Sequence, residues 1–383
     1  MNFELTAEQA SLRDRVRAFV DGEIRPVAHD WERAGRYPTE IVEGMKAMGL
    51  FGITVPRRYG GLEIDMVSLT LVFEEISRGW MGVAGIIGSH SLSCWMIARY
   101  GTEEQRGRWL PGFASGERRT GIALTEPQAG SDLQGIRTTA RRDGDEYVVN
   151  GAKMWIGNAR HADPLPVLVK TDPEAEPRHR GMSVLMVPAG TPGYEVVRDV
   201  GKLGYNGLES CELAFRDARV PADHLLGGEE GKGLRQALSA LEVGRLNVAS
   251  RGVGIAQEAL DLALGYASRR EAFGGPIADF EGVQIKLADM ATKVRAARLL
   301  TWWAAAAVDA GRRADAETGM AKLLASETAL ECALTSMRVH GGIGYSTDLD
   351  VERLYRDAPL LAIGEGTNDV LRIVIARDLL RRA

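Results

Sequence analysis

The first residues of the chain carry an apolar stripe with helical spacing. The apolar positions that share one helical face are Leu12, Val16, Phe19 and Val20. Thr6 followed by Gln9 forms a capping-box pattern, which predicts that a helix begins there, and Pro26 interrupts the pattern. Further helix-like segments follow to about residue 112. We therefore predict a helical domain over residues 1–120.

The hydrophobic period changes in the middle of the chain. Short apolar runs occur at LPVLVK, MSVLMVP, YEVV and CELAF, and Gly, Pro and Asp residues separate them. The pair Asn150-Gly151 follows Tyr147-Val148-Val149, and Asn-Gly accepts the positive φ of a tight turn, so a β-hairpin is predicted there. Four or more short strands at this spacing predict a small antiparallel barrel or sandwich over residues 121–228.

Helical patterns return from about residue 231. One face consists of Ala256, Ala259, Ala263 and Ala267, and another of Val283, Leu287, Met290, Val294 and Ala297. Residues 318–340 form a third helical stretch, which Gly341-Gly342 is expected to end. Ala-rich helices pack closely, so residues 229–383 are predicted to form a helical bundle. The predicted fold class is mostly α with a β-barrel middle domain.

Composition narrows the function classes. The net charge is −5 and there is no basic block, which argues against a nucleic-acid partner. Cys94, Cys211 and Cys332 are far apart, which disfavours a disulfide framework or a zinc site and favours a reducing compartment. We find no apolar signal core and no apolar run that reaches membrane length. We therefore expect a cytoplasmic protein without membrane insertion.

Familiar glycine-rich and catalytic signatures are absent. The segment GGIGY lacks the GxGxxG spacing and follows a helical pattern, and GGEEGKG misses the spacing of a phosphate-binding P-loop. HExxH and GxSxG do not occur. A Rossmann nucleotide site, a metal enzyme and a serine-nucleophile enzyme are all disfavoured, and no metal is expected.

One acidic residue has an unusual setting. Glu365, in APLLAIGEGTNDVLR, directly follows an apolar run and lies between Gly364 and Gly366. A carboxylate near apolar surface loses hydration, which raises its pKa. A Gly-Glu-Gly surface turn is the alternative interpretation.

The segment ALTEPQAGSD is a candidate ligand loop. Thr125, Gly130 and Ser131 offer hydroxyls and backbone N–H groups to a ligand that is rich in acceptors. A polar loop at the entry to a domain is the alternative.

Two aromatic residues have settings that suit a cofactor. Trp155, in GAKMWIGNA, is either a core residue or an aromatic plate beside a planar cofactor. Arg270 and Phe273, in YASRREAFGGPI, place a cation and an aromatic ring at a helix end, where they suit a pyrophosphate and a purine. A surface pair at a helix end is the alternative for the second set.

Six ordered blocks resemble one family, the acyl-CoA dehydrogenases, which are flavoenzymes that desaturate acyl thioesters. The blocks are ALTEPQAGSD, DGDEYVVNGAKMWIGNA, GKLGYNG with CELAFRDARVP, LEVGRLNVASRGVGIAQEALDLALGYASRREAFG, HGGIGY and LYRDAPLLAIGEGTNDV. They cover nearly the whole chain. The family's architecture is a helical domain, a β-barrel domain and a four-helix-bundle domain, which matches the three zones.

The resemblance implies an FAD site and assigns residues to it. The implied FAD-binding residues are Leu124, Thr125, Gly130, Ser131, Trp155, Ile156, Gly157, Arg270, Phe273, Arg338, Gly341, Gly342, Thr367 and Asp369. In the family, the residues that match Arg270 and Phe273 reach the FAD of a neighbouring subunit. The implied substrate-binding residues are Ser131, Arg245 and Gly366.

The resemblance also implies the catalytic base. In the family the base stands either in the loop that matches Glu365 or one residue before the Arg that matches Arg245, which is Gly244 here. A glycine has no group that accepts a proton, so Glu365 remains. The α-hydrogen of a thioester is a weak acid, so its base needs a raised pKa and the developing enolate needs hydrogen-bond donors. Hydride then passes from the β-carbon to flavin N5.

Several positions depart from the family pattern. Gly157 replaces a hydroxyl residue near flavin N5, which keeps an oxygen-using acyl-CoA oxidase open as an alternative. Arg338 and Glu281 stand where Gln is common, and Gly364 replaces a common Tyr, which suits a branched or bulky acyl group. A dehydrogenase that acts on a thioester of an acyl carrier protein, and a flavin-binding protein without turnover, also stay open. The expected partners are acyl-CoA, an electron-transfer flavoprotein and three further copies in a homotetramer, within fatty acid metabolism.

Overall fold

The computed structural model describes residues 4–382, and it begins with a helical domain. The α-helices of this domain are α1 (Ala7–Phe19), α2 (Arg25–Arg33), α3 (Thr39–Ala47), α4 (Met66–Gly79), α5 (Met81–Tyr100) and α6 (Glu103–Ser115). The predicted capping box is present: Thr6 Oγ1 accepts from the Gln9 N–H at 3.2 Å, and the Gln9 side chain accepts from the Thr6 N–H at 3.0 Å. Pro26 lies in the first turn of α2, where no helical hydrogen bond is needed, and a π-helical turn at Val20–Ile24 joins α1 to α2.

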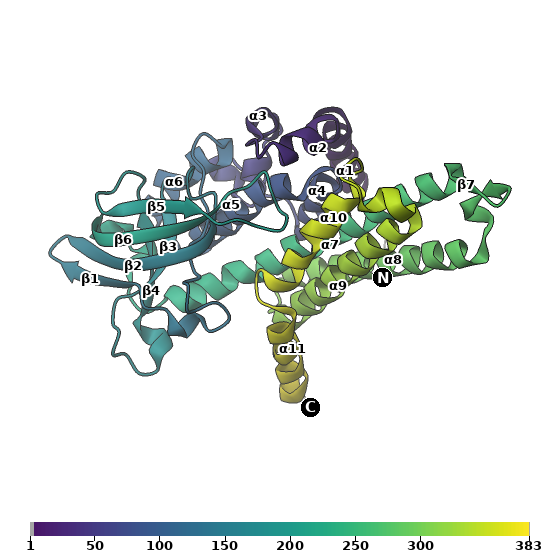
Figure 1. Ribbon diagram of the computed structural model, residues 1–383. Coiled ribbons are helices and arrows are strands. Elements are labelled where there is room, and N and C mark those ends of the chain that lie inside the picture. The colour runs from purple at the N-terminus through teal and green to yellow at the C-terminus, as the bar shows by residue number, and fades with distance from the viewer. Residues whose placement is uncertain (1–3, 383) are drawn as a thin grey trace.

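A mixed six-stranded β-sheet forms the middle of the chain (Figure 1). Its strands are β1 (Thr139–Asp143), β2 (Glu146–Gly157), β3 (Leu165–Lys170), β4 (Met182–Val187), β5 (Tyr194–Asp199) and β6 (Ser210–Pro221). They pair in the order β4-β3-β1-β2-β6-β5, antiparallel except for the parallel pair of β1 and β3. These pairs alone do not close a barrel. The predicted fold class, mostly α with a β-structured middle domain, is confirmed. The expected purely antiparallel pairing is wrong at one place, because β1 and β3 pair in parallel.

The β-hairpin predicted at Asn150-Gly151 is wrong. Strand β2 runs straight through this pair, and the turn lies earlier, at Gly144, whose φ of 64° closes the β1–β2 connection. Asn150-Gly151 instead marks an irregularity in the β2–β6 register, where the Asn150 side chain exchanges hydrogen bonds with Asp217. Gly151 is needed because a Cβ there would lie 2.4 Å from Thr138 Oγ1. Both a close backbone approach and a tight turn favour glycine, so the sequence pattern did not distinguish a close contact from a hairpin turn.

The C-terminal part is a bundle of long helices. They are α7 (Gly233–Arg269), α8 (Glu281–Asp309), α9 (Asp315–His340), α10 (Val351–Ile363) and α11 (Asn368–Arg382), and the short strands β7 (Glu271–Ala272) and β8 (Gly275–Pro276) join α7 to α8. Figure 1 shows the β7–β8 hairpin at the end of the bundle farthest from the sheet, and α11 projecting away from the other helices. Helix α9 ends at Gly341, as predicted, with a φ of 66°.

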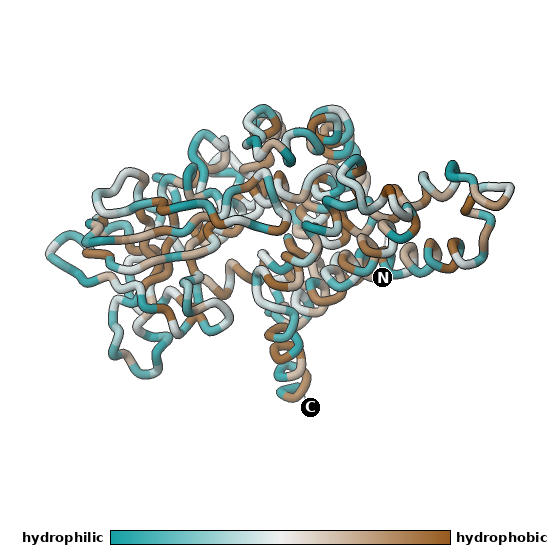
Figure 2. Tube along the Cα trace, in the orientation of Figure 1, coloured by the Kyte–Doolittle hydropathy of each residue, from teal (hydrophilic) through white to brown (hydrophobic). Residues whose placement is uncertain are grey.

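Apolar residues gather where the helices meet. Figure 2 shows hydrophobic positions along the inner helices and mainly hydrophilic loops around the sheet. By length and composition α5 is apolar enough to cross a membrane, which the sequence pattern did not indicate. However, 83% of its apolar window is buried inside the fold, where it packs on α4 and α7. A core helix of a globular domain meets the same criteria, so α5 is accounted for by packing.

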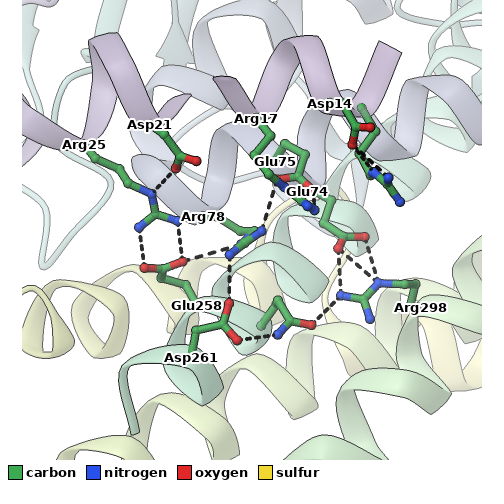
Figure 3. Close-up of polar contacts among 12 residues, drawn as sticks. Asp14, Arg17, Asp21, Arg25, Glu74, Glu75, Arg78, Glu258, Asp261 and Arg298 are labelled. Carbon is green, nitrogen blue, oxygen red and sulfur yellow. Dashed lines mark hydrogen bonds and ion pairs between the residues drawn. The ribbon is translucent and has the colours of Figure 1, made fainter. Parts of the chain in front are cut away.

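A network of charged side chains, joined by the amide of Gln257, ties the N-terminal helices to the bundle (Figure 3). Its members include Arg17, Asp21, Arg25, Glu74, Glu75, Arg78, Gln257, Glu258, Asp261 and Arg298. Its three glutamates are at most 6% exposed, and each is paired with at least one arginine, as burial of a charge requires. The network fixes α1 and α4 on α7, the helix that carries Gly244.

Candidate active site

The loop after α10 places Glu365 in a strained backbone conformation. Glu365 has a φ of 57° and Gly366 a φ of 94°, and a positive φ is uncommon for a residue with a side chain. Lys322 of α9 holds this loop: its Nζ donates to the Gly366 carbonyl oxygen at 2.8 Å and to Asn368 Oδ1 at 3.0 Å. Lys322 is fully buried, so these bonds are shielded from water. The loop conformation is therefore supported by a specific contact from another helix.

The Glu365 carboxylate lies against Gly244 of α7. A Cβ atom on Gly244 would lie 2.7 Å from Glu365 Oε2 and 2.9 Å from Leu92 Cδ2, so the absence of a side chain makes room for the acid. Glu365 Oε2 is buried and has no hydrogen-bond partner among residues 4–382. Burial raises the pKa of Glu365, and the nearby cations Arg251, Lys322 and Arg245 oppose that rise. The two positions considered for a base therefore share one space, which Glu365 fills.

The loop that carries Thr125 is fastened to strand β2 by a buried ion pair. Lys153 Nζ lies 2.8 Å from Glu126 Oε1 and also donates to the Leu124 carbonyl oxygen at 3.0 Å. The Met154 N–H donates to the Thr125 carbonyl oxygen at 2.9 Å. Thr125 is therefore held beside the stretch of β2 that leads into Trp155. Leu124 is buried, whereas Gly130 and Ser131 farther along the loop are exposed.

Trp155 is not a core residue. Its side chain is 53% exposed and its φ is 66°, whereas Ile156 beside it is only 2% exposed. A large aromatic ring that is held outside the core on a strained strand end has the placement of an aromatic plate for a ligand. Next to it, a Cβ on Gly157 would lie 3.3 Å from Leu208 Cδ2, so Leu208 crowds the space where a hydroxyl residue would stand.

A second group of candidate residues gathers at the opposite end of the bundle. Arg270 follows α7, and Phe273 in the β7–β8 hairpin is 98% exposed with a φ of 54°. The rings of Tyr266 and His340 lie 4.4 Å apart, which brings the end of α7 beside the end of α9, where Arg338, Gly341 and Gly342 are exposed. Figure 1 shows that the sheet and this hairpin lie at opposite ends of the molecule. One chain therefore does not bring Arg270 and Phe273 to Trp155.

The other candidate residues lie near Glu365 or on the surface. The Thr367 hydroxyl accepts from the Val370 N–H at 3.3 Å at the start of α11, whereas Asp369 is exposed and paired with Arg372. Arg245 is buried, and its Nη1 lies 3.4 Å from Asp315 Oδ1.

Four polar residues near Glu365 were not singled out from the sequence: the buried Asn247, Arg251 and Lys322, and the partly buried Tyr205. Helical spacing was a usable signal for two of them, because Asn247 and Arg251 lie one and two turns after Gly244 on α7. Tyr205 had no such signal, since it comes from the loop before β6, where its N–H donates to Asp357 Oδ1 of α10 at 2.5 Å.

Trp155 offers an exposed ring, Gly341 and Gly342 offer open backbone, and Arg270 offers a cation, which together suit a large dinucleotide ligand. Family models match three segments: "Acyl-CoA dehydrogenase, N-terminal domain" at residues 6–117, "middle domain" at residues 121–218 and "C-terminal domain" at residues 231–380. The chain belongs to the acyl-CoA dehydrogenase family, whose members are FAD flavoproteins.

Individual relatives agree with this assignment over their full length. The chain is 42% identical to a probable acyl-CoA dehydrogenase of Bacillus subtilis over 383 residues, which covers 100% of both chains. Butyryl-CoA dehydrogenase from Megasphaera elsdenii superposes with a TM-score of 0.96 at 33% identity and covers 99% of this chain and 100% of its own. A chain from a structure described as the electron transferring flavoprotein of Acidaminococcus fermentans also gives 0.96, at 36% identity and 100% coverage of both chains.

Proposed function

We propose that the protein removes the α-proton and the β-hydride of an acyl-CoA, with Glu365 as the base, and forms the 2-enoyl-CoA. Bound FAD supplies a hydride acceptor at its N5 atom. The observation that carries the proposal is the position of the Glu365 carboxylate, which lies in the space left by Gly244 with a buried, unpartnered oxygen. A carboxylate that is stripped of water in this way is a stronger base toward a weak carbon acid.

The Glu365 backbone supports the same reaction. The positive φ of Glu365 and Gly366 takes their peptide groups out of the hydrogen-bond ladder of α10, which ends at Ile363. In our proposal the Glu365 N–H donates to the thioester oxygen, where negative charge develops as the proton leaves. Lys322 then keeps this donor and the carboxylate in one fixed arrangement.

The separation of the two groups of FAD-binding residues supports a shared site. We propose that Arg270 and Phe273 of one copy hold the adenine dinucleotide part of FAD in another copy, within a homotetramer. We propose an electron-transferring flavoprotein as the electron acceptor, because one similar structure is described as an electron transferring flavoprotein. Ser131, Arg245 and Gly366 are proposed to contact the acyl-CoA. The cytoplasm is the proposed location.

The variant Glu365→Gln tests the base assignment. We expect it to retain FAD but to lose bleaching of the flavin absorbance by acyl-CoA, whereas the exposed Glu8→Gln variant retains both. Because the pKa of Glu365 is raised, kcat/KM of the native enzyme should increase with pH as this carboxyl loses its proton. Full activity of Glu365→Gln would refute the assignment.

The same assays separate the alternatives. Turnover with oxygen alone and release of hydrogen peroxide would identify an oxidase, and preference for a carrier-protein thioester over the CoA thioester would identify that substrate. If no acyl thioester bleaches the flavin, the protein binds flavin without turnover.

A further inference from the structure

Two glycines on α5 make room for polar side chains beyond Glu365. A Cβ on Gly88 would lie 2.6 Å from Asn247 Nδ2, and a Cβ on Gly85 would lie 1.8 Å from Tyr205 Oη. Asn247 is 2% exposed, and its Oδ1 has no hydrogen-bond partner among the described residues. Packed helices normally meet through apolar side chains, so the polar side chains between α5 and α7 need an explanation.

Helix register places these polar groups in a row that starts at Glu365. On α5, Leu92 meets Gly244, and the two α5 glycines follow at one and two turns from Leu92. On α7, Asn247 and Arg251 lie one and two turns from Gly244, so the two helices match turn by turn. The row therefore runs from the carboxylate of Glu365 past Asn247 to Arg251.

Arg251 is a buried cation that forms no ion pair with the described residues around it. It is 6% exposed, its Nη1 donates to Tyr205 Oη at 2.9 Å, and its Nε has no partner. The other two buried arginines of residues 4–382 are paired, Arg245 with Asp315 and Arg353 with Asp350, but no carboxylate there forms an ion pair with Arg251. A buried and unpaired charge is costly, and such charges in proteins normally face a counter-charge.

The unpaired charge of Arg251 also affects Glu365, the proposed base. After burial, Arg251 is the largest influence on Glu365, and it lowers the pKa that the reaction needs to be high. An anion that arrives with the substrate would neutralise Arg251 and remove this effect at the moment when the base acts.

The spacing sets the length of that substrate. Seven residues separate Gly244 from Arg251, which is roughly 10 Å along α7. An arginine side chain on a helix leans toward the helix N-terminus, which here is toward Glu365. An extended chain gains roughly 1.2 Å per bond, so a carboxylate about four or five carbons from the thioester lies within the reach of the guanidinium.

We infer that Arg251, with Tyr205 and Asn247 beside it, binds a carboxylate at the far end of the acyl group. The substrate class is a short ω-carboxyacyl-CoA, in which the second carboxylate pairs with the guanidinium and accepts from the Tyr205 hydroxyl. This inference rests on the proposed dehydrogenation at Glu365 and names its acyl group. Specificity follows because an alkyl chain in the same place leaves Arg251 buried and unpaired.

Binding to FAD-loaded Glu365→Gln protein tests the inference without turnover. Calorimetry should give tighter binding of glutaryl-CoA than of butyryl-CoA. Arg251→Met, added to the Glu365→Gln protein, should lower the ratio of the two affinities about ten- to a hundredfold, because the carboxylate loses a hydrogen bond from a charged group. Arg251→Lys should restore part of the preference, and Arg235→Met, an exposed arginine at the start of α7, should leave it unchanged. Native enzyme should show the same order in kcat/KM.

Several outcomes would overturn the inference. Equal affinity for the two thioesters, a preference for butyryl-CoA or for neutral 4-hydroxybutyryl-CoA, or an unchanged preference in Arg251→Met would each exclude a carboxylate site at Arg251. Failure of the proposed function looks different: glutaryl-CoA would still bind through Arg251, but no thioester would bleach the flavin of the native protein.

Discussion

The buried ion pair under the Thr125 loop gives a prediction with a calculable magnitude. Lys153 and Glu126 have side-chain exposures of 0% and 3%. Burial opposes the charge of Glu126, but Lys153 and the N–H groups of Thr138 and Arg137 outweigh it and lower the pKa of Glu126 from 4.5 to about 2. At about 1.4 kcal/mol per pH unit, the Glu126 shift favours the folded state by about 3 kcal/mol. Burial lowers the pKa of Lys153 to about 8, which costs a similar amount, so the pair as a whole contributes little although each partner depends on the other.

Removing the lysine alone should therefore be more harmful than removing both partners. Lys153→Met leaves Glu126 buried without its cation, and we expect a loss of about 3–5 kcal/mol in the free energy of unfolding at neutral pH. The double variant Lys153→Met/Glu126→Gln retains no buried charge and should lose less. Urea unfolding followed by circular dichroism measures both, and the flavin-to-protein ratio should fall in Lys153→Met, because the Thr125 loop loses its anchor.

The pH dependence gives an independent check. Because the pKa of Glu126 is lowered in the folded protein, its contribution is complete above about pH 4.5 and is lost as the pH falls toward about 2. The urea midpoint of the native protein should fall across this range, and that of the double variant should fall less. A Lys153→Met protein with a native midpoint at neutral pH would refute the role of the pair.

Two further substitutions test the catalytic and cofactor assignments. Gly244→Ala places a Cβ 2.7 Å from Glu365 Oε2, so displacement of the carboxylate should lower kcat by about tenfold or more with FAD retained. Gly107→Ala is the control, because a Cβ there meets nothing within 4 Å. A native kcat in Gly244→Ala would contradict the contact. Arg270→Ala should lower the flavin-to-protein ratio without unfolding the chain, since Arg270 is exposed, and exposed Arg269→Ala should not; unchanged FAD occupancy in Arg270→Ala would exclude its role.

Signals that act within one turn of chain were the most reliable in the sequence. The capping box at Thr6 and the end of α9 at Gly341 appear where they were predicted, because each depends on neighbouring residues alone. Asn150-Gly151 is the instructive failure. Its glycine is required by Thr138, which lies just before β1 and against Gly151, and a contact with another segment of the chain leaves no mark on the local pattern.

The candidate site also combines features set by neighbouring residues with contacts between residues far apart in the sequence. The unusual setting of Glu365 was readable from its apolar and glycine neighbours, and its raised pKa agrees with that interpretation. The support of its loop by Lys322 was not readable, since 43 residues separate the two positions in the sequence. Trp155 left two interpretations open, and only its positive φ and its exposed ring exclude the core.

The glycines of α5 and α7 connect fold and specificity. A glycine inside a helix destabilises it by about 0.5–1 kcal/mol relative to alanine, so Gly85, Gly88 and Gly244 look like weak points in sequence. In the structure, each removes a Cβ where a polar side chain lies: Tyr205, Asn247 and Glu365 respectively. Alanine at these positions would favour the helices and exclude the polar groups. The three glycines thus lower helix stability but make room for a row of polar side chains between the two helices, and Glu365, the proposed base, lies at one end of that row.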